Sequence, residues 1–406
     1  MFLYMKKRFI IAILGGLCAI SSFAQTPTQY LTAAKKATEQ RNYAAAAEYY
    51  KIVLQEDAYR NDDATLYRCG ESYRLCNTPK QALVYYNRVK KSDEFPDFNR
   101  NIGLIYKQLG DFAKAKVYFD KLQTPSVDAL REAEGCELTR KKDTAITWQI
   151  EPIKNKQLNS EAADYATAMR NEVLVFTSNR TEITLPTGEV QHLSGVYSYI
   201  KGKTAPVLLP KDGKTYQYAY LFDANIYVAV CDEFGKKCQI ETSDASAGLT
   251  KLNLEALKSD FDWGSASMPF LATENNKTVL YFASDREGGK GGIDLWKTTF
   301  DADKKAWVSL ENVGVNTAGD DIAPFVDTAT NTLYYSSNGR ASLGGYDVFA
   351  AAKTGENWSE EAQHLPEPVN SSYDDYFFFK TADSVAYISS TRNPQLKKGE
   401  NGLCCA

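Results

Sequence analysis

Tyr281-Phe-Ala-Ser-Asp-Arg286, with Gly291-Gly-Ile-Asp-Leu-Trp296 shortly after it, recurs along the chain as Tyr334-Tyr-Ser-Ser-Asn-Gly-Arg340 with Gly344-Gly-Tyr-Asp-Val-Phe349. The two copies lie 53 residues apart and contain short aromatic or β-branched runs separated by turn residues. A period of about 40 to 50 residues with several short strands per unit is typical of a β-propeller. The sequence therefore predicts a β-propeller in the second half of the chain.

The serine, arginine and aspartate of this stretch keep their places from one copy to the next. A catalytic site is needed once, whereas the corner of a blade recurs, so the repetition favours a structural role. Glycine permits a tight turn there, and an aspartate can accept backbone N–H groups. The predicted structural motif consists of Ser178, Arg180, Ser284, Arg286, Asp294, Ser337, Arg340, Asp347, Ser390 and Arg392.

Five propeller units are predicted within residues 163–406, with a sixth blade between 195 and 265 as the alternative. The units begin near residues 164, 216, 266, 322 and 375. The fifth has no aspartate-containing final strand before Cys404-Cys405-Ala406. This favours a truncated last blade at the front of a longer polypeptide, and closure by another route is the alternative.

Residues 25–125 carry a second repeat with the period of paired helices. Gly70 and Ala82 recur as Gly103 and Ala115, 33 residues later, and an aromatic residue follows each alanine. Small residues let helices pack closely, and the pattern resembles three tetratricopeptide repeats. A capping helix is predicted over 126–141 and a linker over 142–162. The predicted fold class is thus α + β multidomain, an N-terminal α-solenoid followed by a β-propeller.

Helical arrays of this kind present a concave groove in which peptides lie. The first helix of each pair lines such a groove, which makes five residues of these helices candidates for partner contact. Ordinary solvated helix positions are the alternative interpretation. The candidates are Tyr67, Arg68, Arg74, Arg100 and Asn101.

The first 24 residues read as a signal peptide. Lys6-Lys-Arg8 is a basic start, an apolar run follows, and Ser22-Phe-Ala24 is a cleavage site of the small-x-small type. The protein is expected to be exported to the periplasm, at the inner face of the outer membrane. Lipidation at Cys18 is the alternative to a soluble form, but Leu17 before it is bulkier than such sites prefer.

Charge and composition exclude several classes. Removing the leader leaves 44 basic residues against 51 acidic ones, a surface with no electrostatic attraction for nucleic acid. Seven cysteines remain, and an odd number cannot all pair within one chain. Cys231 and Cys238 flank a turn and are expected to form a disulfide.

Neither catalysis nor a cofactor is predicted. The sequence has no C-x-x-C pair and no Gly-x-Ser-x-Gly elbow. Its only two histidines, His192 and His364, are isolated from plausible nucleophiles and ligands. We therefore expect no metal site, no cofactor and no enzyme activity.

The combination of leader, helical repeats and Tyr-Phe-x-Ser-[Asp/Asn]-Arg propeller units resembles the PorE-type envelope proteins of Bacteroidetes, whose propeller is of the TolB/WD40-like class. The resemblance implies an outer-membrane-associated periplasmic protein of the type IX secretion and gliding machinery. Its partners would be secretion-system subunits or an outer-membrane barrel. Peptidoglycan would be bound only through a C-terminal OmpA-like domain, which these residues do not contain.

The resulting hypothesis is a non-catalytic scaffold that mediates protein–protein interactions in secretion or gliding. The alternative is a soluble periplasmic receptor for peptides or glycans. In that case an aromatic side chain such as Trp263, Trp296 or Trp307 could stack on a sugar, although packing within a blade is the other role open to each.

Overall fold

The computed structural model describes most of the chain, in two compact units, the first ending at Lys91 and the second beginning at Ser92. The predicted leader, Cys18, Trp263 and the segment from residue 393 onward lie outside the described residues. The described residues are 26–122, 126–138, 148–170, 172–184, 188, 190–200, 202–208, 214–232, 237–243, 250–251, 264–381 and 385–392.

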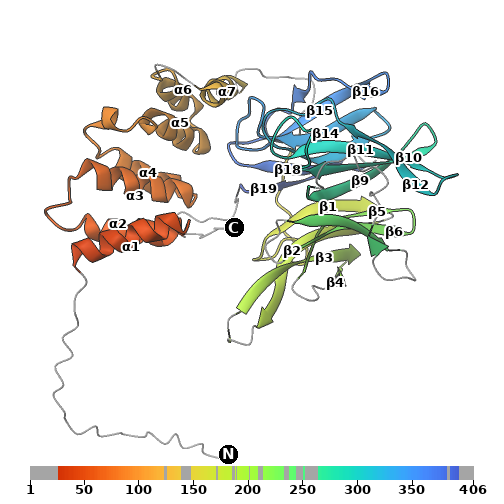
Figure 1. The fold of residues 1–406 in the computed structure, drawn as a ribbon, viewed down its shortest axis with the longest axis horizontal. Coiled ribbons are helices and arrows are strands. Elements are labelled where there is room, and N and C mark those ends of the chain that lie inside the picture. Colours follow the sequence, from red (N-terminus) through yellow and green to blue (C-terminus); the bar gives the residue numbers. More distant parts are fainter. Residues whose placement is uncertain are drawn as a thin grey trace, which may run out of the picture. The chain divides into compact units, whose positions relative to one another are not determined.

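The first unit consists of four helices joined by short turns (Figure 1). Its helices are α1 (Pro27–Glu39), α2 (Tyr43–Val53), α3 (Asp63–Leu75) and α4 (Pro79–Tyr86). Consecutive helices pack against one another. Their starts carry the expected chemistry: Thr26 and Gln29 form a capping box, and Asp62 accepts the Thr65 N–H at 2.8 Å. Asn77 ends α3 with a positive φ of 58°.

Close packing between paired helices depends on the small residues of the repeat. A Cβ placed on Gly70 would lie 2.8 Å from the Tyr86 ring, and one on Gly103 of the second unit would lie 2.7 Å from the Phe119 ring. These glycines therefore admit the aromatic side chain of the second helix of each pair. The assignment of the helices to the tetratricopeptide class stays a prediction.

The second unit begins with a short 3₁₀ helix and three α-helices and continues with the strands. The helices are η1 (Ser92–Glu94), α5 (Phe98–Gln108), α6 (Phe112–Phe119) and α7 (Val127–Gly135). The third helix pair of the predicted array thus belongs to the same compact unit as the strands. α7 packs on α6 and buries Ala115, Phe119 and Cys136.

The strands of this unit form five antiparallel sheets, each built from strands consecutive in sequence. The first sheet contains β1 (Asp164–Arg170), β2 (Val173–Thr184), β3 (Val190–Ile200) and β4 (Lys203–Leu208). The second contains β5 (Thr215–Phe222), β6 (Asn225–Cys231), β7 (Cys238–Ser243) and β8 (Thr250–Lys251). The third contains β9 (Ala266–Glu274), β10 (Lys277–Ser284), β11 (Asp294–Asp301) and β12 (Ala306–Asn312).

The fourth sheet has five strands, β13 (Asp321–Asp327), β14 (Thr332–Ser337), β15 (Asp347–Thr354), β16 (Asn357–Trp358) and β17 (Gln363–His364). The last sheet has two described strands, β18 (Asp375–Lys380) and β19 (Ala386–Ser390). Four sheets therefore have the size of propeller blades.

The first strands of the five sheets are neighbours in a ring. β1 contacts β5, β5 contacts β9, β9 contacts β13, β13 contacts β18, and β18 contacts β1. The Ala166 N–H of β1 donates to Ser389 Oγ of β19 at 3.1 Å. The strands thus form a β-propeller-like arrangement, as predicted, while the predicted number of five or six blades stays a prediction.

Candidate functional site

The first unit contains a groove between two of its helices. It encloses about 280 Å³ and is lined mainly by α1 and α3. Its lining consists of Lys35, Thr38, Glu39, Tyr50, Arg68, Glu71, Ser72 and Leu75. The α3 residues among these are spaced by three and four positions, which places them on one face of that helix. The groove therefore presents the first helix of each of two consecutive pairs.

Some charged side chains of the groove have ion-pair partners and others have none that the structure describes. Glu71 accepts from Arg74, with Nε 2.7 Å from Oε1, and also accepts the hydroxyl of Tyr86. Lys35 and Arg68 are both exposed, and neither has an ion-pair partner among the residues described. Their cationic groups are therefore available to a carbonyl, hydroxyl or carboxylate oxygen of a bound molecule.

An apolar element completes the groove. Leu75, at the end of α3, is 43 % exposed. Ser72 and Thr38 use their hydroxyls in the same way. The Ser72 hydroxyl donates to the Arg68 carbonyl oxygen at 2.8 Å, and the Thr38 hydroxyl donates to the Ala34 carbonyl oxygen at 2.9 Å, in each case four residues earlier in the same helix. The lining thus combines two cations, one apolar side chain and hydroxyl acceptors.

The five predicted groove residues have different surroundings in the structure. Arg68 lines the groove, whereas Arg74 forms an ion pair with Glu71. Tyr67 is half-buried, and its ring packs edge-on against the Tyr86 ring at 5.6 Å.

The other two predicted residues, Arg100 and Asn101, belong to α5 in the second unit, where Asn101 is buried. Sequence reasoning missed most of the actual lining. A 36-residue displacement relates Lys35, Thr38 and Glu39 to Glu71, Arg74 and Leu75, and that displacement could have identified them.

The recurring serine and arginine of the second unit contact each other, within β2 in the first sheet and at the end of β10 in the third. The Nε of Arg180 donates to Ser178 Oγ at 2.8 Å, and the same bond joins Arg286 to Ser284 at 2.9 Å. The Arg180 guanidinium also lies over the Phe176 ring, 5.1 Å from its centre. The pair fixes the strand end to its own sheet.

The same contact recurs in the last sheet and is altered in the fourth. Arg392 Nε donates to Ser390 Oγ at 2.8 Å. In the fourth sheet Gly339 is inserted before the arginine, and its N–H donates to Ser337 Oγ at 3.1 Å, as the arginine N–H does to the serine in the other sheets. Arg340 then donates to the Val315 carbonyl oxygen at 2.8 Å. The motif therefore still forms hydrogen bonds at this position in the fourth sheet, although the serine and the arginine are one residue further apart.

The recurring aspartates receive backbone N–H groups, as the turn chemistry predicts. Asp294 Oδ2 accepts from Lys290 at 2.8 Å and from Gly291 at 3.1 Å. Asp347 accepts the Gly344 N–H at 3.1 Å. His364 is not isolated, because its Nε2 lies 2.6 Å from Asp347 Oδ2.

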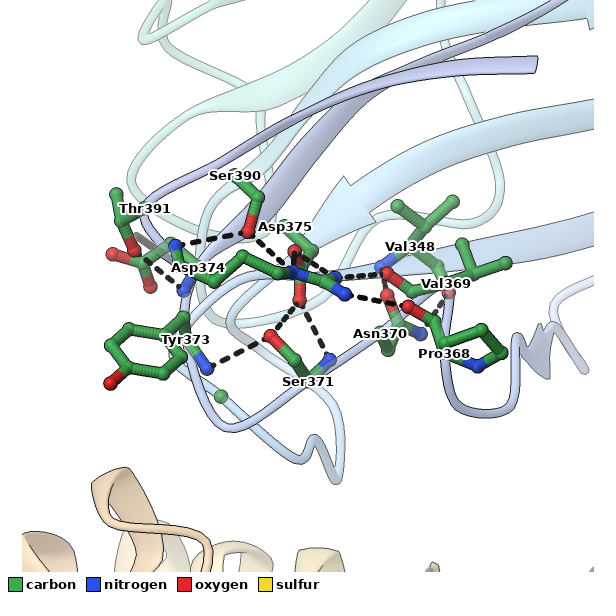
Figure 2. A network of polar contacts seen from close by, with 12 residues as sticks. Val348, Pro368, Val369, Asn370, Ser371, Tyr373, Asp374, Asp375, Ser390 and Thr391 are labelled. Carbon is green, nitrogen blue, oxygen red and sulfur yellow. Dashed lines mark hydrogen bonds and ion pairs between the residues drawn. The ribbon is translucent and has the colours of Figure 1, made fainter. Parts of the chain in front are cut away.

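Each junction between the later sheets is closed by an asparagine. Figure 2 shows Asn370 beside Val348: the side-chain oxygen accepts the Val348 N–H at 2.7 Å and the side-chain nitrogen donates to the Val348 carbonyl at 2.9 Å. Asn316 makes the same two bonds with Leu295, both at 2.8 Å. An asparagine of one sheet thereby completes the third strand of the sheet before it.

The buried aspartates that begin the inner strands belong to the same junctions. Asp375 accepts the N–H and the hydroxyl of Ser371, each at 2.7 Å, and is ion-paired with Arg392 (Figure 2). Burial raises the pKa of Asp375, although Arg392 lowers it. Asp321 makes the matching bonds to Thr317, and burial raises the pKa of Asp321 to about 6.

A small cavity lies where the inner strands of the five sheets meet. It encloses about 50 Å³, and each sheet contributes a three-residue stretch that begins at a residue with positive φ. The stretches are 166–168, 218–220, 268–270, 323–325 and 377–379. No carboxylate is among these lining residues, which are mostly apolar and aromatic.

Two other expectations concern aromatic and metal sites. Trp296 and Trp307 are 7 % and 6 % exposed and pack in the core, so neither presents a sugar platform. In the described part of the chain no three of the metal-binding residue types gather to hold an ion. None of the described helices is long and apolar enough to cross a membrane.

No family model and no curated protein matches the chain. Solved structures with a similar arrangement include a thermostable family-43 glycoside hydrolase, with a TM-score of 0.35 and 9 % identity over 56 % of this chain and 83 % of that one. An α-L-arabinofuranosidase from Lactobacillus brevis matches with a TM-score of 0.33 and 10 % identity over 58 % and 85 % of the two chains. A sucrose-6-phosphate hydrolase from Lactobacillus gasseri matches with 0.33 and 14 % over 55 % and 53 %.

These neighbours contradict two predictions from the sequence. The chain was expected to be a scaffold of secretion or gliding machinery and to lack enzyme activity, yet the similar structures are glycoside hydrolases and none of those named here is a secretion protein. Both predictions are withdrawn. TM-scores of 0.33 to 0.35 at 9 to 14 % identity do not assign the hydrolases' activity to this chain, and the resemblance to PorE-type proteins stays a prediction.

Proposed function

We propose that the protein is an exported receptor that binds an extended peptide or an oligosaccharide in the groove between α1 and α3. The groove itself carries the proposal. Ligand pockets typically enclose about 300 to 1,000 Å³, a range that the groove approaches and the central cavity does not. The cavity of about 50 Å³ holds no more than a few water molecules.

The chemistry of the lining supports the same site. Lys35 and Arg68 offer donors that no other described residue uses, so their hydrogen bonds to a ligand break no existing bond. Leu75 offers apolar surface beside them. A ligand with oxygen acceptors and an apolar group is therefore complementary to the groove.

The compartment follows from the leader and from cysteine chemistry. The basic and apolar start of the chain fits a secretory signal. The disulfide between Cys231 and Cys238, which the sequence predicted, fits an oxidising compartment such as the periplasm. We place the mature receptor there.

For the fold, we propose five blades, counting β18 and β19 as the fifth. Each of the five sheets contributes one positive-φ stretch to the central cavity. The bond from the Ala166 N–H to Ser389 Oγ matches the one from the Tyr218 N–H to Thr177 Oγ1, which joins the first two sheets at 2.9 Å. We likewise assign the helix pairs to the tetratricopeptide class on their 33-residue spacing.

The test is a binding screen of purified residues 25–406 on arrays of immobilised peptides and glycans, followed by titration of the strongest hit. Replacing Lys35→Ala together with Arg68→Ala should weaken binding about tenfold or more, because two charge-assisted hydrogen bonds are lost. The matched control is Lys36→Ala with Lys80→Ala, two exposed lysines of the same unit outside the groove lining. Equal loss in both double variants, or no hit at all, would overturn the proposal.

A further inference from the structure

The disulfide of the second sheet occupies the position that a serine and an aspartate hold in the third and fourth sheets. Across the second and third strands, Ser284 pairs with Asp294 in the third sheet and Ser337 pairs with Asp347 in the fourth. The pair in the second sheet is Cys231 with Cys238. In each case the pair joins the end of the second strand to the beginning of the third.

The aspartate of this corner anchors the loop that precedes the third strand. Asp294 and Asp347 each accept N–H groups from residues three and four positions earlier. Cys238 has no carboxylate, so its side chain cannot accept backbone N–H groups as Asp294 and Asp347 do. A covalent bond to Cys231 closes the corner there instead.

The same corner also contacts the next sheet. The Cys238 N–H donates to Ser265 Oγ at 2.9 Å, and β9 of the third sheet begins one residue later. Of the segment that precedes β9 the structure describes residues 264–265, and neither is an asparagine like those that close the later junctions. Opening the corner would therefore loosen this junction as well as the sheet.

We propose that the Cys231–Cys238 disulfide replaces the serine–aspartate corner and makes the second sheet a redox-sensitive element of the propeller. Reduction by a dithiol transfers two electrons and two protons to the disulfide, which breaks the sulfur–sulfur bond and leaves one thiol on each cysteine. The dithiol is oxidised to its own disulfide. Cys231 is buried and Cys238 is half-buried, so the reductant approaches from Cys238.

The experiment is hydrogen exchange of residues 25–406 with and without dithiothreitol. In the unaltered protein, reduction should speed exchange in β6 and β7 by about tenfold or more, with β10 of the third sheet unchanged as the internal reference. Protection that survives verified reduction would overturn the proposal.

Two variants separate the corner from the other cysteines. Cys231→Ser with Cys238→Asp installs the serine–aspartate pair of the third and fourth sheets. This variant should keep β6 and β7 protected whether or not dithiothreitol is present. Cys231→Ala with Cys238→Ala should exchange fast in both conditions. If the serine–aspartate variant exchanges as fast as the alanine variant, the disulfide does not replace that corner. Should either variant fail to fold, the reduction of the unaltered protein still decides.

Discussion

The groove of the first unit and the corners of the second both concentrate charged side chains, but the charges have different partners. In the corners, Asp375 contacts Ser371 and Arg392 and is fully buried. In the groove, Lys35 and Arg68 are exposed and make no ion pair with a described residue. Side chains that recur in several sheets thus stabilise the fold, whereas groove charges that do not recur are available to a ligand.

The largest expected effect is on a corner. Asp375→Ala should lower the free energy of unfolding by about 3 to 5 kcal/mol, because the half-buried Arg392 and the Ser371 N–H and hydroxyl would lose their buried partner. Urea denaturation of the second unit measures the change. Asp303→Ala, at an exposed turn, is the control and should cost under about 0.5 kcal/mol. If the two variants lost similar free energies of unfolding, the contacts of Asp375 would not be what stabilises the corner.

Stability should also depend on pH through Asp321. Burial raises the pKa of Asp321 to about 6, whereas an unfolded aspartate titrates near about 3.9. The folded state therefore holds a proton that the unfolded state has lost, and this contribution to stability is lost as pH rises from about 4 to 6.

The loss should be on the order of 2 to 3 kcal/mol. Unfolding measured across that window in the unaltered protein and in Asp321→Asn checks it, since the variant should lack this part of the pH dependence. Identical curves for the two proteins would contradict the assignment.

A smaller effect is expected in the first unit. Gly70→Ala should cost about 1 to 3 kcal/mol, because the new Cβ would lie 2.8 Å from the Tyr86 ring. Thermal unfolding measures the change, with Ser72→Ala on the same helix as the comparison. An unchanged melting temperature for Gly70→Ala would show that the helix pair adjusts without strain.

The smallest effect on stability is expected at the groove. Arg68→Ala should change the free energy of unfolding by less than about 0.5 kcal/mol, because the guanidinium is exposed and has no ion-pair partner among the described residues. Its effect should appear in ligand binding instead. A large loss of stability would mean that Arg68 is a structural residue like the corner arginines.

The corners could be predicted from the sequence, because a 53-residue spacing marks each serine and aspartate and turn chemistry assigns their role. The disulfide followed from two cysteines beside one turn. The junction between His364, Asp347 and Asn370 could not, because a histidine without neighbours in sequence gives no sign of its partners in space.

The predicted partner groove stays a prediction, and of its five residues only Arg68 lines the groove on the first unit. A helical period identifies a face only after the helix bounds are known, and α1 carries few apolar residues to set its register. Lys35 and Glu39 were therefore missed, whereas Arg100 and Asn101 were assigned to a groove that the structure describes only for the first unit. The predicted function was wrong because it rested on resemblance rather than on the geometry of a site.

The most direct test of the receptor proposal is hydrogen exchange of residues 25–406 with and without the strongest ligand from the array screen. The proposal predicts slower exchange confined to α1 and α3, around residues 35–39 and 68–75. Slower exchange confined to the strands of the second unit, with α1 and α3 unchanged, would contradict it.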